Sequence, residues 1–290
     1  MNHTLGFIGL GVMGSGMSSN LARKSQRTLV VYDPDETAMT AAVEVGAQAR
    51  GSVAAVGGEA DIVFLSLPSI VQVESVCEEL LAGPSRPQIV VDMSTSDVTR
   101  TRVLAERLRA EGIALVDAPV ARQRQAAAAG TLLITVGADD ETFALLQPYL
   151  SCMGTDIVQA GDVGAGQVLK IMNNMVLFIN MNAVAEALAI GRAAGVNPQT
   201  LFSTLALGSA DSFALRNTAT ATMIPDEYPE RAFPVDYAMK DLKLALQLAA
   251  DSEVPIGSAQ QTMDLLQRAH DAGLGAAYYP VMIKVIEGRA

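Results

Sequence analysis

The segment GFIGLGVMGSGM, near the N-terminus, constrains the fold of this chain more than any other stretch. Gly9, Gly11 and Gly14 form the pattern G-x-G-x-x-G, directly after a short apolar run and at the start of a helical pattern. The first glycine allows a tight turn, the second lets a pyrophosphate approach the backbone, and the third permits close helix–strand packing. The segment therefore predicts a dinucleotide-binding turn, which Val12 and Met13 complete.

Short apolar runs with strand character alternate with helical patterns through residue 160. The runs are LGFIGL (5–10), TLVVYD (28–33), DIVFLSL (61–67), QIVVDM (88–93), IALVDAPV (113–120) and TLLITVG (131–137), and helical patterns cover 36–45, 70–81 and 97–111. Runs that are apolar throughout and separated by helices are typical of a parallel sheet covered on both faces.

The strand patterns stop after residue 160. Residues 164–195 indicate one long helix, apolar nearly all round and therefore buried. A membrane span is the rival interpretation, which Lys170 and several asparagines disfavour. We therefore expect an α/β fold with a Rossmann-like dinucleotide-binding domain over residues 1–162. A long interdomain helix and an all-helical substrate and oligomerisation domain follow over residues 163–290. Further helices are predicted at 198–207, 235–251, 256–272 and 277–287.

Composition excludes several classes of protein. The 290 residues leave room for two domains, and a net charge of −11 argues against a nucleic-acid binder. Cys77 and Cys152 both fall in predicted helices without a paired motif, which fits a reducing compartment. His3 and His270 lie in no cluster with zinc spacing, so no metal site is expected. The N-terminus lacks the features of a signal peptide, and we expect a cytoplasmic protein without a membrane partner.

Asp33 ends the second predicted strand, at the position where an acidic residue binds the adenosine ribose hydroxyls. A 2′-phosphate would be repelled there, and residues 34–36 offer no Arg or Lys to receive it. The sequence therefore favours NAD over NADP as the cofactor.

Lys170 and Asn174 are four residues apart, so they lie on one face of the long helix. A lysine in an otherwise apolar helix is costly unless it has a partner or a function. Desolvation lowers the pKa of such a side chain, which suits a general acid/base near neutral pH. The alternative is a lysine whose ammonium group reaches the surface, and the pattern alone leaves both open.

Five ordered blocks, which span essentially the whole chain, resemble the β-hydroxyacid dehydrogenase family. They are FIGLGVMGSGMSSNL, DMSTS, DAPV followed by GTL, GAGQVLKIMNN and FPVDYAMKDLKLAL. The family includes 3-hydroxyisobutyrate dehydrogenase and tartronate semialdehyde reductase. The resemblance implies NAD(P)-dependent hydride transfer that interconverts a small anionic β-hydroxy acid, or an ω-hydroxy acid, with its semialdehyde. The apolar helices of the second domain suggest a homodimer or homotetramer.

The resemblance also implies roles for single residues. Lys170 would be the catalytic acid/base, and Asn174 would bind the substrate. Ser94 and Thr95 would line the nicotinamide end, with Thr95 also touching the substrate; without the resemblance the two indicate a simple helix cap. Lys240 would bind the cofactor, although its pattern alone indicates a surface charge. The other residues expected on the cofactor side are Leu67, Pro68 and Asp241.

The stretch DAPVARQ departs from the family, which continues DAPV with Ser-Gly-Gly and holds the substrate carboxylate with those backbone amides. Ala121, Arg122 and Gln123 stand there instead. An arginine at this place could supply a forked contact to an anion, and the sulfolactaldehyde reductases carry one at the equivalent position. Arg122 and Gln123 are therefore predicted to bind the substrate. The alternative is that Arg122 and Arg124 lie on a solvated loop.

The choice of substrate stays open at this stage. The departure at DAPVARQ argues against 3-hydroxyisobutyrate as the substrate. Reduction of 3-sulfolactaldehyde or of succinic semialdehyde is the alternative activity. A non-catalytic NAD-binding sensor is the alternative from another class of protein.

Overall fold

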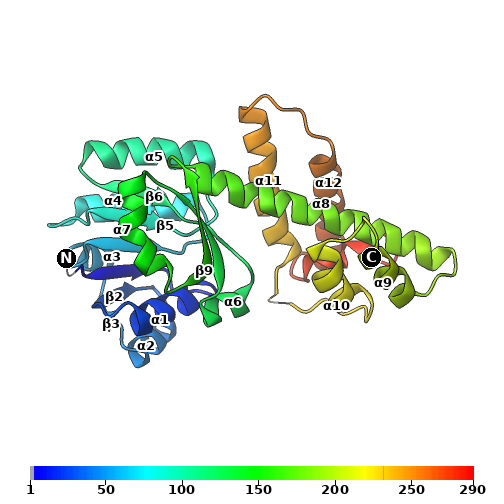
Figure 1. Cartoon of the computed structure of the whole chain (residues 1–290), viewed down its shortest axis with the longest axis horizontal. Coiled ribbons are helices and arrows are strands. Elements are labelled where there is room, and N and C mark those ends of the chain that lie inside the picture. Colours follow the sequence, from blue (N-terminus) through cyan, green and yellow to red (C-terminus); the bar gives the residue numbers. More distant parts are fainter. Residues whose placement is uncertain (1–2, 231) are drawn as a thin grey trace. The chain divides into compact units, whose positions relative to one another are not determined.

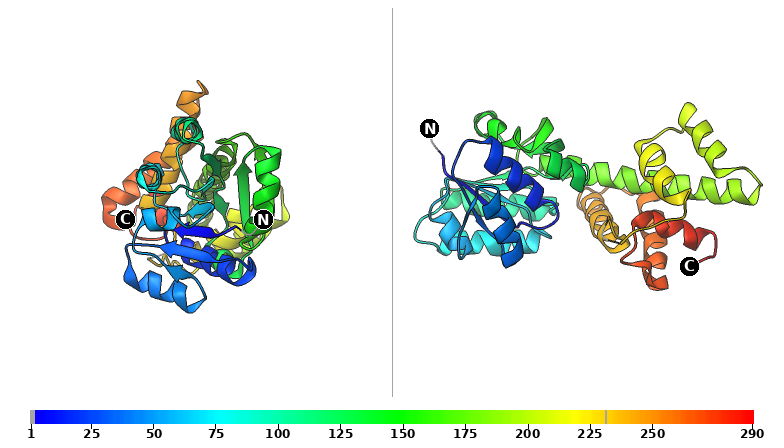
Figure 2. Two further views of the ribbon diagram at one scale, coloured as in Figure 1. Left: turned by 90° about the vertical axis from the view of Figure 1, so that its left-hand side faces the viewer. Right: turned by 90° about the horizontal axis from the view of Figure 1, so that it is seen from below.

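The computed structural model describes residues 3–230 and 232–290, and the chain divides between Lys170 and Ile171 into two compact units. The first unit is an α/β domain, and the second consists of helices (Figures 1 and 2). The predicted fold class is therefore confirmed. The domain boundary predicted at residues 162/163 stays a prediction.

One sheet forms the centre of the first unit. Its strands are β1 (Leu5–Ile8), β2 (Leu29–Tyr32), β3 (Gln48–Ala49), β4 (Ile62–Leu65), β5 (Ile89–Asp92), β6 (Ala114–Asp117), β7 (Val120–Ala121), β8 (Leu132–Gly137) and β9 (Gly154–Gly161). The helices around it are α1 (Gly14–Lys24), α2 (Glu36–Glu44), α3 (Val53–Gly57), α4 (Ile70–Ala82), α5 (Val98–Ala110), α6 (Arg124–Ala129) and α7 (Asp140–Leu150). The strand order is β3-β2-β1-β4-β5-β6-β8-β7, and β9 pairs with β8.

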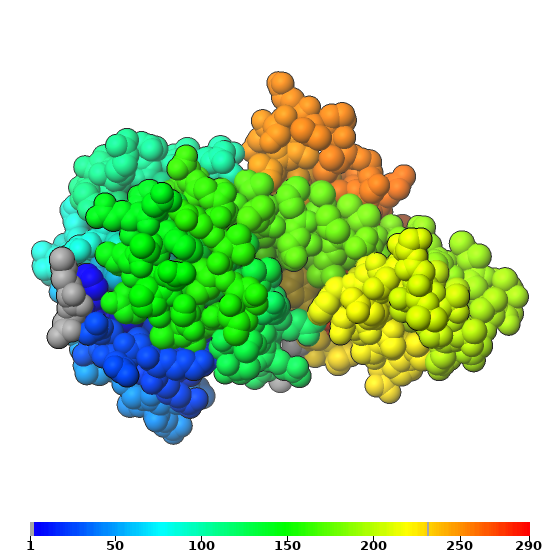
Figure 3. Space-filling model, in the orientation of Figure 1, coloured from blue at the N-terminus to red at the C-terminus, as the bar shows by residue number. Residues whose placement is uncertain are grey.

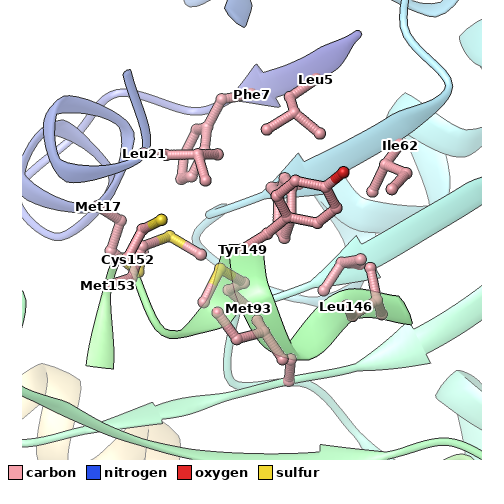
Figure 4. Close-up of a cluster of buried hydrophobic side chains, with 14 of the residues drawn as sticks. Leu5, Phe7, Met17, Leu21, Ile62, Met93, Leu146, Tyr149, Cys152 and Met153 are labelled. Atoms are coloured by element: carbon pink, nitrogen blue, oxygen red, sulfur yellow. The ribbon is translucent and has the colours of Figure 1, made fainter. Parts of the chain in front are cut away.

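Both faces of the central strands of this sheet are buried, as the apolar runs predict. Successive residues of a strand point to opposite faces, and β1, β4 and β5 are buried at every position. On one face, Phe7 and Phe64 stack with their ring centroids 6.3 Å apart. Phe7, Met17 of α1 and Leu146 of α7 belong to the same core (Figure 4). On the other face, Val63 belongs to a second core that α3, α4 and α5 cover.

The predicted sheet is wrong in one respect, because it is not parallel throughout. The strand predicted at 131–137 is present as β8, but it runs antiparallel to β6 and β7. The run predicted as one strand at 113–120 breaks before Pro119, which has no amide hydrogen for the ladder, and the chain then turns into β7. The sequence also missed β9, because this edge strand is largely exposed and lacks a continuous apolar run. In Figure 3 the green segment that holds α7 and β9 covers much of the visible surface of the first unit.

Helix α8 (Ala165–Ala193) begins in the first unit and continues into the second. By length and composition it could cross a membrane, which is weak evidence for a span. In the second unit its side chains Ile171, Phe178 and Met181 are buried, and the ring of Phe178 meets that of Tyr279 edge-on at 5.2 Å. Helix α8 is therefore a core helix.

The remaining elements of the second unit are helical. They are α9 (Pro198–Leu207), a π-helical segment at Ala214–Ala219, α10 (Thr220–Met223), α11 (Val235–Asp251), α12 (Ser258–Ala269), a π-helical turn at His270–Leu274, a 3-10 turn at Tyr279–Val281 and α13 (Met282–Ile286). The helices predicted at 198–207 and 235–251 are confirmed, whereas the segment 214–223 was missed because its threonines and asparagine have low helix propensity. Cys77 lies in α4 as predicted, but Cys152 lies in the turn after α7.

Candidate active site

The turn after β1 leaves open space at its second glycine. Gly9 has a φ of +94°, and a Cβ there would overlap the carbonyl oxygen of Ser66. A Cβ at Gly14 would overlap the carbonyl oxygen of Gly9, whereas a Cβ at Gly11 would meet nothing within 4 Å. Gly9 and Gly14 are therefore required by the packing of the turn, and the open side of Gly11 fits a phosphate group that approaches the start of α1.

The carboxylate of Asp33 braces this turn from the end of β2. Its Oδ2 accepts the backbone N–H of Leu10 at 2.6 Å, and its Oδ1 accepts that of Asp35 at 2.8 Å. Each carboxylate oxygen can accept a second hydrogen bond. The side chain therefore fits the ribose hydroxyls of a dinucleotide while it holds the glycine turn.

A second buried acid, Asp92 at the end of β5, shapes the loop that contains Thr95. Its Oδ1 accepts the backbone N–H of Ser94 at 2.9 Å, and its Oδ2 accepts the hydroxyl of Ser96 at 2.7 Å. Burial raises the pKa of Asp92, and the hydrogen bonds from both serines act against that shift. The hydroxyl of Ser94 accepts the N–H of Leu67 at 2.9 Å, so the loops after β4 and β5 are joined.

A third acid, Asp117 at the end of β6, holds the beginning of α8. It accepts the N–H groups of Gly164 and Gln167, each at 2.7 Å. Burial raises the pKa of Asp117 to about 6, and these two hydrogen bonds act against that shift. The carboxamide of Gln167 in turn binds the loop after β5, because it donates to the carbonyl of Ser94 at 2.9 Å and accepts the N–H of Ser96 at 3.0 Å.

Arg122 has the backbone conformation of a glycine, with a φ of +78°. Its guanidinium forms an ion pair with Asp156 on β9 at 2.7 Å and donates to the carbonyl of Thr131 at 2.7 Å and the hydroxyl of Thr155 at 3.1 Å. The Thr155 hydroxyl and Arg122 hold the pKa of Asp156 below its usual value. In these contacts the guanidinium braces its own turn against β8 and β9.

The second unit contains a polar cluster around the buried Asp241 of α11. Asn174 of α8 donates to its Oδ2 at 2.7 Å, and the ammonium group of Lys240 lies 3.2 Å from its Oδ1. Asn173 donates to the carbonyl oxygen of the Asn174 side chain at 3.1 Å. The same ammonium group of Lys240 lies 4.2 Å from the ring centroid of Tyr237. The cluster unites three of the residues that the sequence singled out: Asn174, Lys240 and Asp241.

The predicted site residues thus fall into two sets. The first unit holds Gly9, Gly11, Val12, Met13, Gly14, Asp33, Leu67, Pro68, Thr95, Arg122, Gln123 and Lys170, and the second holds Asn174 and Lys240. Lys170 and Asn174 lie one turn apart on α8, and Lys170 is partly buried. Sequence reasoning missed Asp92, Asp117 and Gln167. A signal for the two acids was present, because each follows directly on an apolar strand run.

Comparison with known proteins gives matches along the whole chain. Residues 4–161 match the family described as the NAD binding domain of 6-phosphogluconate dehydrogenase. Residues 164–286 match the family described as NAD-binding of NADP-dependent 3-hydroxyisobutyrate dehydrogenase.

Individual proteins of this family also match the chain over nearly its whole length. A 2-(hydroxymethyl)glutarate dehydrogenase of Eubacterium barkeri is 35% identical, over 98% of this chain and 94% of its own length. A 3-hydroxyisobutyrate dehydrogenase of Pseudomonas aeruginosa is 36% identical, over 92% of this chain and 93% of its own length. The solved structure of 3-hydroxyisobutyrate dehydrogenase from Mycobacterium tuberculosis with L-serine is 30% identical, with a TM-score of 0.90 over 99% of both chains. The chain therefore belongs to the β-hydroxyacid dehydrogenase family, and it is an NAD(P)-dependent oxidoreductase that acts on a CH–OH group.

Proposed function

We propose that the protein interconverts a small anionic β-hydroxy acid, or an ω-hydroxy acid, with its semialdehyde, and that Lys170 is the acid/base. The supporting observation is that β1, β4, β5 and β6 are neighbours whose carboxyl ends carry the glycine turn, Leu67, Thr95 and Asp117. In open parallel sheets, ligands bind at this edge. The start of α8 is hydrogen-bonded to the same edge through Gly164 and Gln167, and Lys170 follows Gln167 by three residues. We expect a cytoplasmic homodimer or homotetramer.

In the proposed mechanism the chain's own residues transfer the proton and orient the substrate. A bound nicotinamide supplies the acceptor or donor of the hydride at its C4 atom. During oxidation the amine of Lys170 takes the hydroxyl proton of the substrate, and during reduction its ammonium group returns a proton to the carbonyl oxygen. Thr95 and Asn174 hydrogen-bond that oxygen and orient it, which lowers the barrier by prior positioning. The other proposed cofactor contacts are Val12, Met13, Leu67, Pro68 and Lys240.

We predict that NAD supports a much higher kcat/KM than NADP. The carboxylate of Asp33 accepts the ribose hydroxyls but repels a 2′-phosphate. Paired steady-state kinetics with both cofactors measure the preference, and Asp33→Asn should narrow it because the negative charge is removed. Equal use of the two cofactors by the unchanged protein would contradict the assignment of Asp33.

The substrate anion is assigned to the turn at residues 121–123. Arg122 stands where the resemblance places a glycine, and its φ of +78° is a conformation that glycine adopts without strain. The backbone amides of Arg122 and Gln123 can therefore hold the anion, as the resemblance implies for the family. The guanidinium already pairs with Asp156. We therefore propose that the side chain of Arg122 braces the turn and that its backbone contacts the substrate.

Arg122→Gly should keep kcat/KM for the preferred acid within about threefold, because the lost ion pair is exposed and glycine adopts a positive φ without strain. Arg122→Ala should cost more, since it loses the brace and keeps the strained φ. The contradicting result would be that Arg122→Gly lowers kcat/KM for the acid roughly ten- to a hundredfold and leaves kcat/KM for an uncharged analogue unchanged. That result would show that the guanidinium itself binds the anion, as the sequence predicts.

A substrate panel tests the proposed function as a whole. It contains 3-hydroxyisobutyrate, 2-(hydroxymethyl)glutarate, L-serine, succinic semialdehyde and 3-sulfolactaldehyde, each assayed with both cofactors by the absorbance of the reduced nicotinamide. Steady turnover of at least one of these anions is expected. Binding of NAD without turnover of any of them would instead support a sensor. A preference for the sulfonate would favour the sulfolactaldehyde alternative.

A further inference from the structure

The carboxamide of Gln167 forms hydrogen bonds with the backbone on both sides of Thr95. Its Nε2 donates to the carbonyl of Ser94 at 2.9 Å, and its Oε1 accepts the N–H of Ser96 at 3.0 Å. Gln167 is completely buried and belongs to the first turn of α8. One side chain of the helix therefore fixes both peptide groups that flank a residue of the proposed site.

Buried acids anchor both ends of this connection. Asp117 accepts the backbone N–H of Gln167 itself and that of Gly164, so it holds the first turn of α8 at the end of β6. Asp92 accepts from the N–H of Ser94 and the hydroxyl of Ser96, so it holds the loop at the end of β5. β5 and β6 are adjacent, and Asp92 and Asp117 are register partners. The helix and the loop are thus tied to each other and to the same sheet edge.

Lys170 follows Gln167 by three residues, and side chains three apart are neighbours on one side of a helix. A rotation or shift of the first turn of α8 would therefore move Lys170 relative to Thr95. We propose that Gln167 is a positioning residue that, with Asp92 and Asp117, sets the geometry between Thr95 and Lys170 for proton transfer. This inference rests on the proposed function, because it assigns the proton to Lys170.

The chemistry of the side chain favours this role over simple packing. A buried amide is costly unless its hydrogen bonds are made, whereas an apolar side chain of similar size would fill the same space without that cost. The two hydrogen bonds fix direction as well as distance, which an apolar contact does not. A misplacement of about 1 Å at a reacting group can lower a rate by about a hundredfold.

The experiment is a double-mutant cycle on the full chain with NAD and the preferred hydroxy acid. Gln167→Met removes both hydrogen bonds at similar volume and should lower kcat by roughly ten- to a hundredfold, while the Kd for NAD changes little. In a Lys170→Ala background, measured by single turnover, the same change should cost less than about threefold, because residues that act together are not additive. Gln159→Met is the matched control, since this exposed amide on β9 donates to the carbonyl of Ala138 at 3.2 Å and to the carboxylate of Asp140 at 2.9 Å, away from the proposed site, and its loss should leave kcat unchanged.

The results distinguish a failure of the positioning role of Gln167 from a failure of the proposed role of Lys170. If Gln167→Met does not fold, Gln167→Asn takes its place, because it keeps a neutral amide but is shorter by one methylene, so it cannot make both hydrogen bonds at their present lengths. Equal losses of kcat with and without Lys170 would overturn the inference and leave the proposed function intact. Near-normal kcat in Gln167→Met would overturn it as well. If Lys170→Ala alone keeps near-normal activity, the proposed role of Lys170 fails, and this inference fails with it.

Discussion

Replacing Lys170 by alanine should lower kcat by roughly two to four decades, the usual effect of removing a general acid/base. The affinity for NAD should barely change, because the proposed cofactor contacts are the glycine turn, Asp33, the loops after β4 and β5, and Lys240, and they do not include Lys170. Steady-state or single-turnover rates give kcat, and titration of the protein with NAD gives the affinity. The combination of a large loss in rate with intact binding separates a chemical role from a structural one.

Two further variants test whether the loss of rate comes from the lost proton transfer at Lys170. Lys170→Arg keeps the positive charge but cannot release a proton near neutral pH, so its kcat should stay close to that of the alanine variant. Lys243→Ala, a change of the same kind at an exposed position of α11, should leave kcat unchanged. A Lys170→Ala protein with near-normal kcat would remove Lys170 from the mechanism.

Replacing Gly11 by valine should weaken NAD binding strongly and leave the folded protein intact. A Cβ at Gly11 meets nothing within 4 Å in the chain, so the melting temperature should not fall. The added side chain would occupy the space in which the pyrophosphate approaches the backbone. The loss of hydrogen bonds to a charged group is worth about 1.5–3 kcal/mol, which raises the Kd for NAD roughly ten- to a hundredfold. Calorimetric or fluorescence titration measures it.

Two other glycines serve as controls for this experiment. A Cβ at Gly51 also meets nothing within 4 Å, and Gly51→Val should change neither the melting temperature nor the Kd for NAD. Gly14→Ala places a Cβ against the carbonyl oxygen of Gly9, so it should lower the melting temperature as well as the affinity. If Gly11→Val binds NAD as tightly as the unchanged protein, the cofactor does not approach this turn.

The strands and the long helix could be predicted because their signals are local. A strand buried on both faces must be apolar at every position, and the runs at β1, β4 and β5 show that pattern within a few residues. The glycine turn is equally local as a pattern, since its three glycines stand within one strand–turn–helix segment. The steric reason for Gly9 is not local, because a Cβ there would overlap the carbonyl oxygen of Ser66. Strand β9 was not predicted because its mostly exposed residues make no continuous apolar run.

The sequence by itself determined which residue types stand at the proposed site: three glycines, Asp33, Thr95, Lys170 and Asn174. Only the tertiary structure decided how two side chains are used, because their partners are distant in the chain. Arg122 lies 34 residues before Asp156, and its ion pair exists because β8 and β9 are paired. Gln167 lies 71 residues after Ser96, and their hydrogen bond exists because the start of α8 lies against the loop after β5. A residue's own neighbourhood in sequence carries no trace of such contacts, since the free energy that creates them comes from the packing of separate elements.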